Sequence, residues 1–153
     1  MSGAVASIES LQKKLAALGI ESTRIHINVA AHSTLVEPIL KEFREFLGTI
    51  KLSAPKLPFV SNVTGTWITA EEAADPDYWV RHLRGTVQFS RGLETLLSQG
   101  DRALLEVGPG QTLSTFARQH PARPSKAAVV ASLRHPQEQT ADTRFLATSL
   151  GKL

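Results

Sequence analysis

The sequence of 153 residues contains no cysteine, one methionine and only 6% aromatic side chains. The absence of cysteine excludes disulfides, thiolate metal sites and cysteine nucleophiles, and it is consistent with a reducing compartment. No apolar run approaches the ~20 residues that a helix needs to span a bilayer. The first residues, MSGAVAS, lack the basic and apolar regions of a secretory signal, so we expect a cytoplasmic protein with no membrane partner.

A serine nucleophile in its usual setting is also missing, because the chain has no Gly-x-Ser-x-Gly elbow. It does have a histidine in a position that suits a general base. His32 follows an alternating apolar run and precedes Ser33, which can begin a helix. An imidazole titrates near neutral pH and can both take and return a hydroxyl proton. The alternative is a polar residue at an ordinary turn, and the residues by themselves leave both open.

Charged side chains are balanced and scattered. Lys and Arg total 17 against 14 Asp and Glu, a net charge of +3, and the two signs are mixed in segments such as 41–45. Nucleic-acid binding would require a clustered basic stripe with interleaved aromatics, which this sequence lacks. No His, Asp and Glu set has the spacing of metal ligands. We therefore expect neither nucleic acid nor a metal, whereas the mild basic bias suits an acidic protein partner.

Helical and extended patterns alternate along the chain, which indicates an α/β fold. Amphipathic spacing predicts helices over 7–19, 33–47, 69–74, 75–83, 88–99 and 112–120 and in the tail from 137, and short strands over 23–29, 59–61, 102–107 and 127–133. Ser33 or Thr34 is the expected N-cap of the second helix, with Glu37 as a capping-box partner. Four short strands are few for an independent sheet.

Three further segments combine polar or aromatic side chains with turn residues. The Gly-Pro-Gly turn at 108–110 lies between a predicted strand and a helix, so it is either an anion-binding turn or a tight connection. Its spacing matches neither phosphate-loop motif. Asn62, in the turn 61–65, either orients another side chain or is a plain turn residue. Tyr78 and Trp79 near His82 are typical of a core or an interface.

These segments, taken in order, resemble a known family. The set consists of Val29-Ala30-Ala31-His32-Ser33, Glu37-Pro38-Ile39-Leu40, Pro58 to Gly65, Asp75 to Leu83, Val87-Gln88-Phe89 and Leu105 to Gly110. Their order and spacing resemble the acyltransferase domain of modular type I polyketide synthases and, more distantly, malonyl-CoA:acyl carrier protein transacylases. The resemblance covers Val5 to about Leu133. It implies a transacylase-like fold, with part of an α/β-hydrolase-like large subdomain and part of a ferredoxin-like small subdomain.

The resemblance also implies a ping-pong Ser/His mechanism. In this family a serine in Gly-His-Ser-x-Gly attacks an acyl-CoA thioester, a histidine activates the serine, and the acyl group passes to the phosphopantetheine thiol of an acyl carrier protein. His32 matches the catalytic histidine. Gln88 matches a residue that helps to orient it, although Thr86 replaces the usual proline, and Asn62 matches a polar residue near the site. Acyl-CoA and carrier-protein phosphopantetheine are the expected ligands, with no bound cofactor.

The residues before the histidine correlate with the extender unit in this family. Val29, Ala30 and Ala31 occupy these substrate-specificity positions. With His32 they match neither His-Ala-Phe-His, associated with malonyl units, nor Tyr-Ala-Ser-His, associated with methylmalonyl units. Ala31 removes bulk where the malonyl motif has phenylalanine, but one methylene discriminates by only about 1–3 kcal/mol. The extender unit is left open.

The resemblance divides the chain into three parts. Residues 1–28 match a partial ferredoxin-like subdomain, 29–133 the C-terminal part of the large subdomain, and 134–153 the start of the following linker. Because the serine elbow belongs to the family's N-terminal half, we expect a fragment that is inactive alone. Its expected partners are an acyl carrier protein and a serine-bearing N-terminal half or ketosynthase-acyltransferase region. The alternative is a non-catalytic remnant or binding module that docks a carrier protein or the rest of a synthase.

Overall fold

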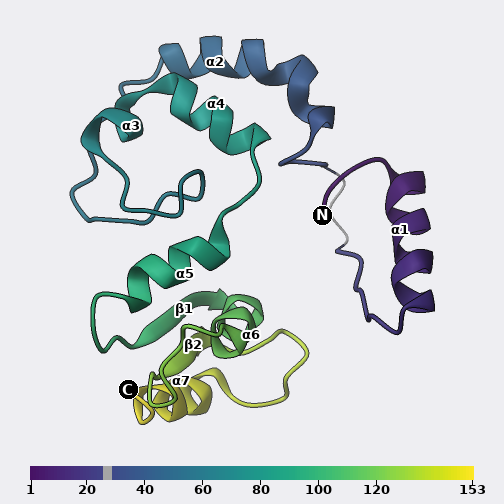
Figure 1. Cartoon of the computed structure of the whole chain (residues 1–153). Coiled ribbons are helices and arrows are strands. Elements are labelled where there is room, and N and C mark those ends of the chain that lie inside the picture. Colours follow the sequence, from purple (N-terminus) through teal and green to yellow (C-terminus); the bar gives the residue numbers. More distant parts are fainter. Residues whose placement is uncertain (26–28) are drawn as a thin grey trace. The chain divides into compact units, whose positions relative to one another are not determined.

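The computed structural model describes residues 1–25 and 29–153 and shows an α/β chain. The chain forms two compact units, Met1–Gln88 and Phe89–Leu153, whose elements are labelled in Figure 1. The first unit holds α1 (Val5–Ala17), the 3-10 helix η1 (Thr34–Ile39), α2 (Leu40–Gly48), α3 (Ala70–Ala74) and α4 (Pro76–Arg84). The second holds α5 (Phe89–Leu97), β1 (Leu104–Pro109), α6 (Thr112–Gln119), β2 (Val129–Leu133) and α7 (Asp142–Leu150).

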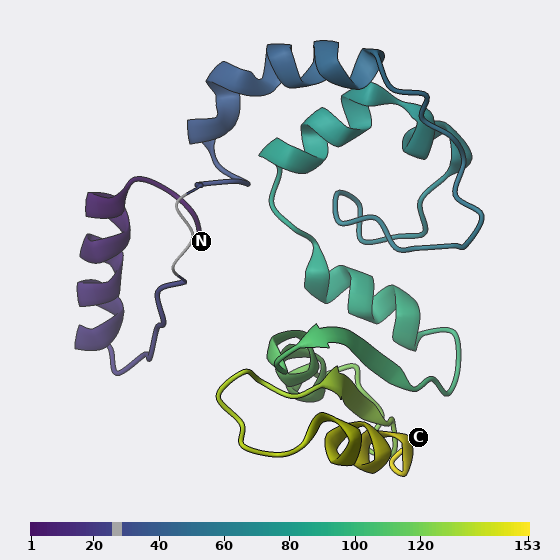
Figure 2. The same ribbon diagram turned by 180° about the vertical axis from the view of Figure 1, so that it is seen from behind.

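The second unit is built around a parallel strand pair. β1 and β2 lie side by side, with Leu104 opposite Val129 and Pro109 opposite Leu133, and α6 connects them. Figures 1 and 2 show α5 and α7 on opposite sides of the two strands. The core of this unit contains Leu93 and Leu97 of α5 with Ala117 of α6. These two strands confirm the predictions over 102–107 and 127–133.

The strand predicted over 23–29 does not form in the described part of that segment. Thr23 to Ile25 and Val29 have no strand geometry, and residues 26–28 lie outside the described residues. The segment 59–61 makes only one isolated antiparallel bridge, between Val60 and Trp67. A strand needs neighbours to pair its backbone groups, and among the described residues neither segment has a neighbouring strand. The predicted subdomain boundaries at 28/29 and 133/134 stay a prediction.

The helix predicted over 33–47 is two helices, η1 and α2. The Ser33 hydroxyl caps η1 by accepting the Leu35 N–H at 3.2 Å. Glu37 is not a capping-box partner, since its carboxylate pairs with Arg84 of α4 at 2.8 Å. Pro38 lies inside η1 and lacks the N–H that a regular α-helix would use there. The tighter 3-10 turn therefore precedes α2.

Helix α4 is the element that supports the candidate site. Asp75 caps it by accepting the Asp77 N–H at 2.8 Å, and Pro76 occupies its first position. Asp77 also accepts two hydrogen bonds from the Arg44 guanidinium of α2, at 2.5 and 3.0 Å. The other predicted helices form with bounds shifted by a few residues. None of the helices in 1–25 and 29–153 has the length and apolar character needed to cross a bilayer.

Candidate active site

His32 lies at a strained turn immediately before η1. Its φ is 60°, and it is the one non-glycine residue with positive φ among those that the structure describes. Such a conformation costs an L-residue about 1–2 kcal/mol, and strain of this kind clusters at functional sites. The His32 N–H donates to the Leu83 carbonyl at 2.9 Å, one of the carbonyls that the end of α4 leaves unpaired. The end of α4 therefore holds this turn.

The His32 ring is oriented by a second carbonyl from the same helix end. Its Nδ1 lies 2.8 Å from the Gly85 carbonyl oxygen. Because a carbonyl oxygen can only accept, Nδ1 carries the proton and donates. The Nε2 of the neutral ring then keeps its lone pair. This tautomer can take a proton from a hydroxyl or thiol, which is the task of a general base.

His82 of α4 packs against the His32 ring. The two ring centroids are 5.9 Å apart and the planes are nearly perpendicular, at 78°. Burial, and secondarily the charge of His32, lowers the pKa of His82 below its ordinary value of 6.5. His82 is therefore neutral at neutral pH and places no positive charge beside an imidazolium on His32. The sequence suggested only core or interface for Tyr78, Trp79 and His82.

The predicted orienting residues Asn62 and Gln88 lie together. The Gln88 N–H donates to the Asn62 carbonyl at 2.8 Å, and the Gln88 side chain donates to the Thr86 carbonyl at 3.4 Å. Within the described residues neither side chain forms a hydrogen bond with His32, whose ring partner is Gly85. The roles of Gln88 and Asn62 stay predictions. Gly85 was not among the predicted site residues; its only signal is a glycine just after a predicted helix.

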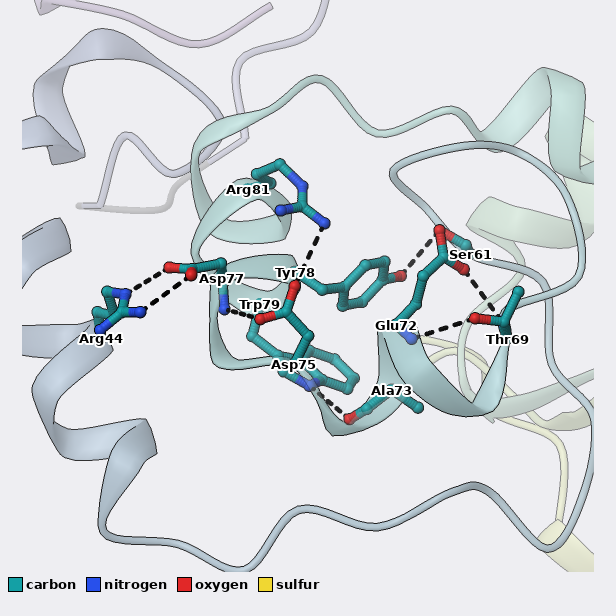
Figure 3. Close-up of polar contacts among 10 residues, drawn as sticks. All are labelled: Arg44, Ser61, Thr69, Glu72, Ala73, Asp75, Asp77, Tyr78, Trp79 and Arg81. Atoms are coloured by element: carbon teal, nitrogen blue, oxygen red, sulfur yellow. Dashed lines mark hydrogen bonds and ion pairs between the residues drawn. The ribbon is translucent and has the colours of Figure 1, made fainter.

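Ser61 and Tyr78 support the turn that contains Asn62. Their exposed fractions are 0% and 1%. The Tyr78 hydroxyl donates to Ser61 Oγ at 2.8 Å, as Figure 3 shows, and the same oxygen accepts the N–H groups of Val63 and Thr64 at 3.1 and 3.2 Å. One buried hydroxyl thus joins the turn to α4, the helix that also holds His32.

The predicted specificity residues lead directly into the His32 turn. Val29 is 63% exposed, and Ala30 and Ala31 are half-buried. The Ala30 carbonyl accepts the Ser33 hydroxyl at 2.7 Å, which ties this segment to the start of η1. Their influence on the acyl group stays a prediction.

The Gly-Pro-Gly turn at 108–110 is a tight connection and not an open anion site. The Glu106 carboxylate already accepts the Leu113 and Ser114 N–H groups at the start of α6, at 3.2 and 2.8 Å. Burial raises the pKa of Glu106, but hydrogen bonds from Ser114 and Leu113, together with the Arg118 charge, lower it further than burial raises it. Among the described residues no group of three or more His, Asp or Glu side chains could hold a metal ion.

Comparison with known proteins places this chain in a family. The sequence matches the acyl transferase domain family over residues 1–153. It is 33% identical over 146 residues to a component of the phenolphthiocerol/phthiocerol polyketide synthase of Mycobacterium tuberculosis, covering 95% of this chain and 10% of that protein. It is 39% identical over 114 residues to the pikromycin polyketide synthase component PikAIII of Streptomyces venezuelae, covering 74% of this chain and 7% of that one.

Solved structures agree with this assignment. The acyl transferase domain of SpnD, in complex with 2-(pent-4-yn-1-yl)malonyl, matches with a TM-score of 0.89 and 36% identity, over 98% of this chain and 36% of that one. MCAT from Streptococcus pneumoniae shares the fold, with a TM-score of 0.73 at 21% identity, over 99% of this chain and 46% of that one. The predicted α/β transacylase-like fold is therefore confirmed. The chain spans about a third of the SpnD domain structure, and it belongs to the acyl transferase domain family, in the branch formed by the acyltransferase domains of polyketide synthases.

Proposed function

We propose that this chain supplies the general base of an acyltransferase that moves a malonyl-type unit from acyl-CoA to the phosphopantetheine thiol of an acyl carrier protein. One observation carries the proposal: the hydrogen bond from His32 Nδ1 to the Gly85 carbonyl leaves Nε2 free to accept a proton. The family match over the whole chain supports acyl transfer. The malonyl derivative in the SpnD complex supports the class of acyl group.

The reaction would run in two half-reactions that both use His32 Nε2. In the first, Nε2 takes the proton of a serine hydroxyl, the serine oxygen attacks the acyl-CoA thioester, and the thiolate of CoA leaves with the proton that Nε2 returns. In the second, Nε2 takes the proton of the phosphopantetheine thiol, whose sulfur attacks the acyl-serine ester. The serine leaves as a hydroxyl after Nε2 returns the proton, so the enzyme ends unchanged.

The serine would come from a segment outside residues 1–153. The SpnD domain structure is nearly three times as long as the part matched here, since this chain covers 36% of it. In this proposal the chain contributes a base whose tautomer and position are already set by α4. Residues 29–31 would flank the acyl group, and Gln88 and Asn62 would restrain the segment after α4.

Reconstitution with a serine-bearing N-terminal half tests the proposal. The full chain is mixed with that half, and transfer of radiolabelled malonyl and methylmalonyl groups from CoA to an acyl carrier protein is measured. We expect label on the carrier protein only when both halves are present, and a loss of about 10²–10⁴-fold with His32→Ala. His135→Ala is the matched control, because His135 is exposed and lies in the other unit.

The outcomes separate catalysis from binding. Labelling that depends on His32 but not on His135 supports the general-base role, and the ratio of the two labels reports the extender preference. If the two halves associate and remain folded but no label transfers, the base role is wrong. Association without transfer would then favour a binding module that docks the rest of a synthase.

A further inference from the structure

A cleft in the second unit is lined by side chains that have no part in the acyl transfer proposed above. Its volume is about 370 Å³, which is within the range of small-molecule sites. Residues 129–131 of β2 give the cleft an apolar strip, and Phe145 of α7 adds an aromatic face. Ser149, which is 7% exposed, contributes a hydroxyl. The cleft therefore combines apolar walls with polar groups.

Three cationic side chains line this cleft: Arg118 of α6, Arg144 of α7 and Lys152 just after α7. Its lining within the described residues includes no carboxylate. Arg144 and Lys152 have no ion-pair partner in the part of the chain that the structure describes. Arg118 donates to the Val129 carbonyl at 3.1 Å and to Gln111 Oε1 at 3.4 Å, and a guanidinium has five donors. Most of the N–H donors of these three cations therefore have no acceptor among the described residues.

The carboxylates nearest in sequence to these elements do not line the cleft. Glu106 accepts two N–H groups at the start of α6, and the Arg118 charge acts on it from outside the lining. Glu138 accepts the His135 N–H and the Gln111 amide, both at 3.4 Å. Asp142 pairs with Arg134 at 2.7 Å. Gathering three positive charges in one concave site without an acid raises repulsion between them, and a bound anion removes it.

We propose that this cleft binds a small molecule that carries two phosphate groups, such as a diphosphate or a nucleotide bisphosphate. Three cations match a polyanion better than a single carboxylate, which would leave two of them uncompensated. Arginine forks pair bidentately with phosphate oxygens, and the cleft offers two of them. The Phe145 ring and the β2 strip provide a surface for an organic part of the ligand.

Titration of the ¹⁵N-labelled full chain tests this site without any assay of acyl transfer. Inorganic pyrophosphate and adenosine 3′,5′-bisphosphate are added at constant ionic strength, and backbone amide shifts are followed. We expect saturable shifts confined to β2, the end of α6 and α7. The double variant Arg144→Gln/Lys152→Gln should bind each compound at least about tenfold more weakly. Tenfold is about the lower end of what charge-assisted hydrogen bonds contribute to affinity.

The matched control is Arg91→Gln/Lys126→Gln. Both of its residues are exposed cations of the same unit that do not line the cleft, so the control loses the same net charge. Equal weakening in both double variants would show general charge attraction and overturn the proposal, as would absent or non-saturable shifts or shifts centred elsewhere. Tighter binding of the adenosine compound than of pyrophosphate would support a nucleotide ligand, and equal binding would support recognition of the diphosphate alone.

Discussion

The Gly85 carbonyl orients the His32 ring, so substitution of Gly85 tests whether this contact fixes the position of the ring. A Cβ atom at this position would lie 2.9 Å from the Arg81 carbonyl oxygen, closer than carbon and backbone oxygen approach without movement. The Gly85 N–H donates to the same oxygen at 2.7 Å. Gly85→Ala therefore forces residue 85 away from α4, and its own carbonyl, the partner of His32, moves with it.

The expected magnitude follows from this overlap. Forcing one methyl group into an occupied space costs about 1–3 kcal/mol. Gly48→Ala is the matched control: Gly48 ends α2 in the same unit, and a Cβ there would meet no atom within 4 Å. Replacing glycine with alanine in a helix raises the free energy of unfolding by up to about 1 kcal/mol. The two glycine substitutions should therefore change the free energy of unfolding in opposite directions.

Two measurements detect the change in stability and the change in the His32 ring. Urea denaturation gives the free energy of unfolding of each variant, and imidazole ¹⁵N shifts report which ring nitrogen of His32 carries the proton. We expect Gly85→Ala to be less stable and to lose the Nδ1–H preference, and to lower reconstituted acyl transfer by about 10²-fold through misplacement of the base. Equal stability of the two variants, with an unchanged His32 tautomer, would refute this reasoning.

Three further predictions concern the groups around the site and the second unit. The pKa of His82 is lowered in the folded chain, so the unfolded chain binds the proton first as pH falls through 6.5. The free energy of unfolding should therefore decrease below that pH, and His82→Asn should weaken this pH dependence in urea denaturation. Tyr78→Phe removes one donor and should cost about 1 kcal/mol. Ser61→Ala leaves the buried Tyr78 hydroxyl and two partly buried N–H groups without their acceptor and should cost roughly 3 kcal/mol. Similar losses in the two denaturation curves would contradict the idea that Ser61 joins the turn to α4. Glu106→Gln removes a negative charge from the α6 N-terminus and should cost about 0.5–1 kcal/mol at low salt. Since the pKa of Glu106 is lowered on folding, this difference should be present above pH 4.5 and disappear as pH falls through the folded-state pKa.

Features set by neighbouring residues in the chain were predictable from the sequence. Asp75 and Pro76 predict the start of α4 because a side-chain cap and a residue without an N–H act on the first turn alone. The same reasoning predicted a helix after His32. It did not predict that η1 would precede α2, although Pro38 is a local signal for that break. Nor did it predict the pairing of Glu37 with Arg84, because Arg84 lies 47 residues along the chain.

Features that depend on distant backbone atoms were not predictable in this way. The alternation over 23–29 indicates a strand face but says nothing about a partner strand. Gly85 orients His32 across 53 residues of sequence through a carbonyl oxygen. Every residue has such an oxygen, so no residue type marks it as an orienter. The family resemblance matches polar side chains, and it therefore points to Gln88 and Asn62 and not to Gly85.

The orientation of His32, the base of the proposed reaction, depends on a helix end more than on a charged neighbour. The strained backbone of His32 costs about 1–2 kcal/mol, and its hydrogen bonds to the Leu83 and Gly85 carbonyls contribute about 1 kcal/mol each. The cost of the strained backbone and the gain from the two hydrogen bonds are thus nearly equal. The turn therefore keeps its shape only while the end of α4 stays in place. That end is held by the Arg84–Glu37 pair, and the start of the helix by the Asp77–Arg44 pair. In the proposed reaction, these contacts of α4 with η1 and α2 touch no substrate, but they help to position the His32 Nε2 by stabilising both ends of α4.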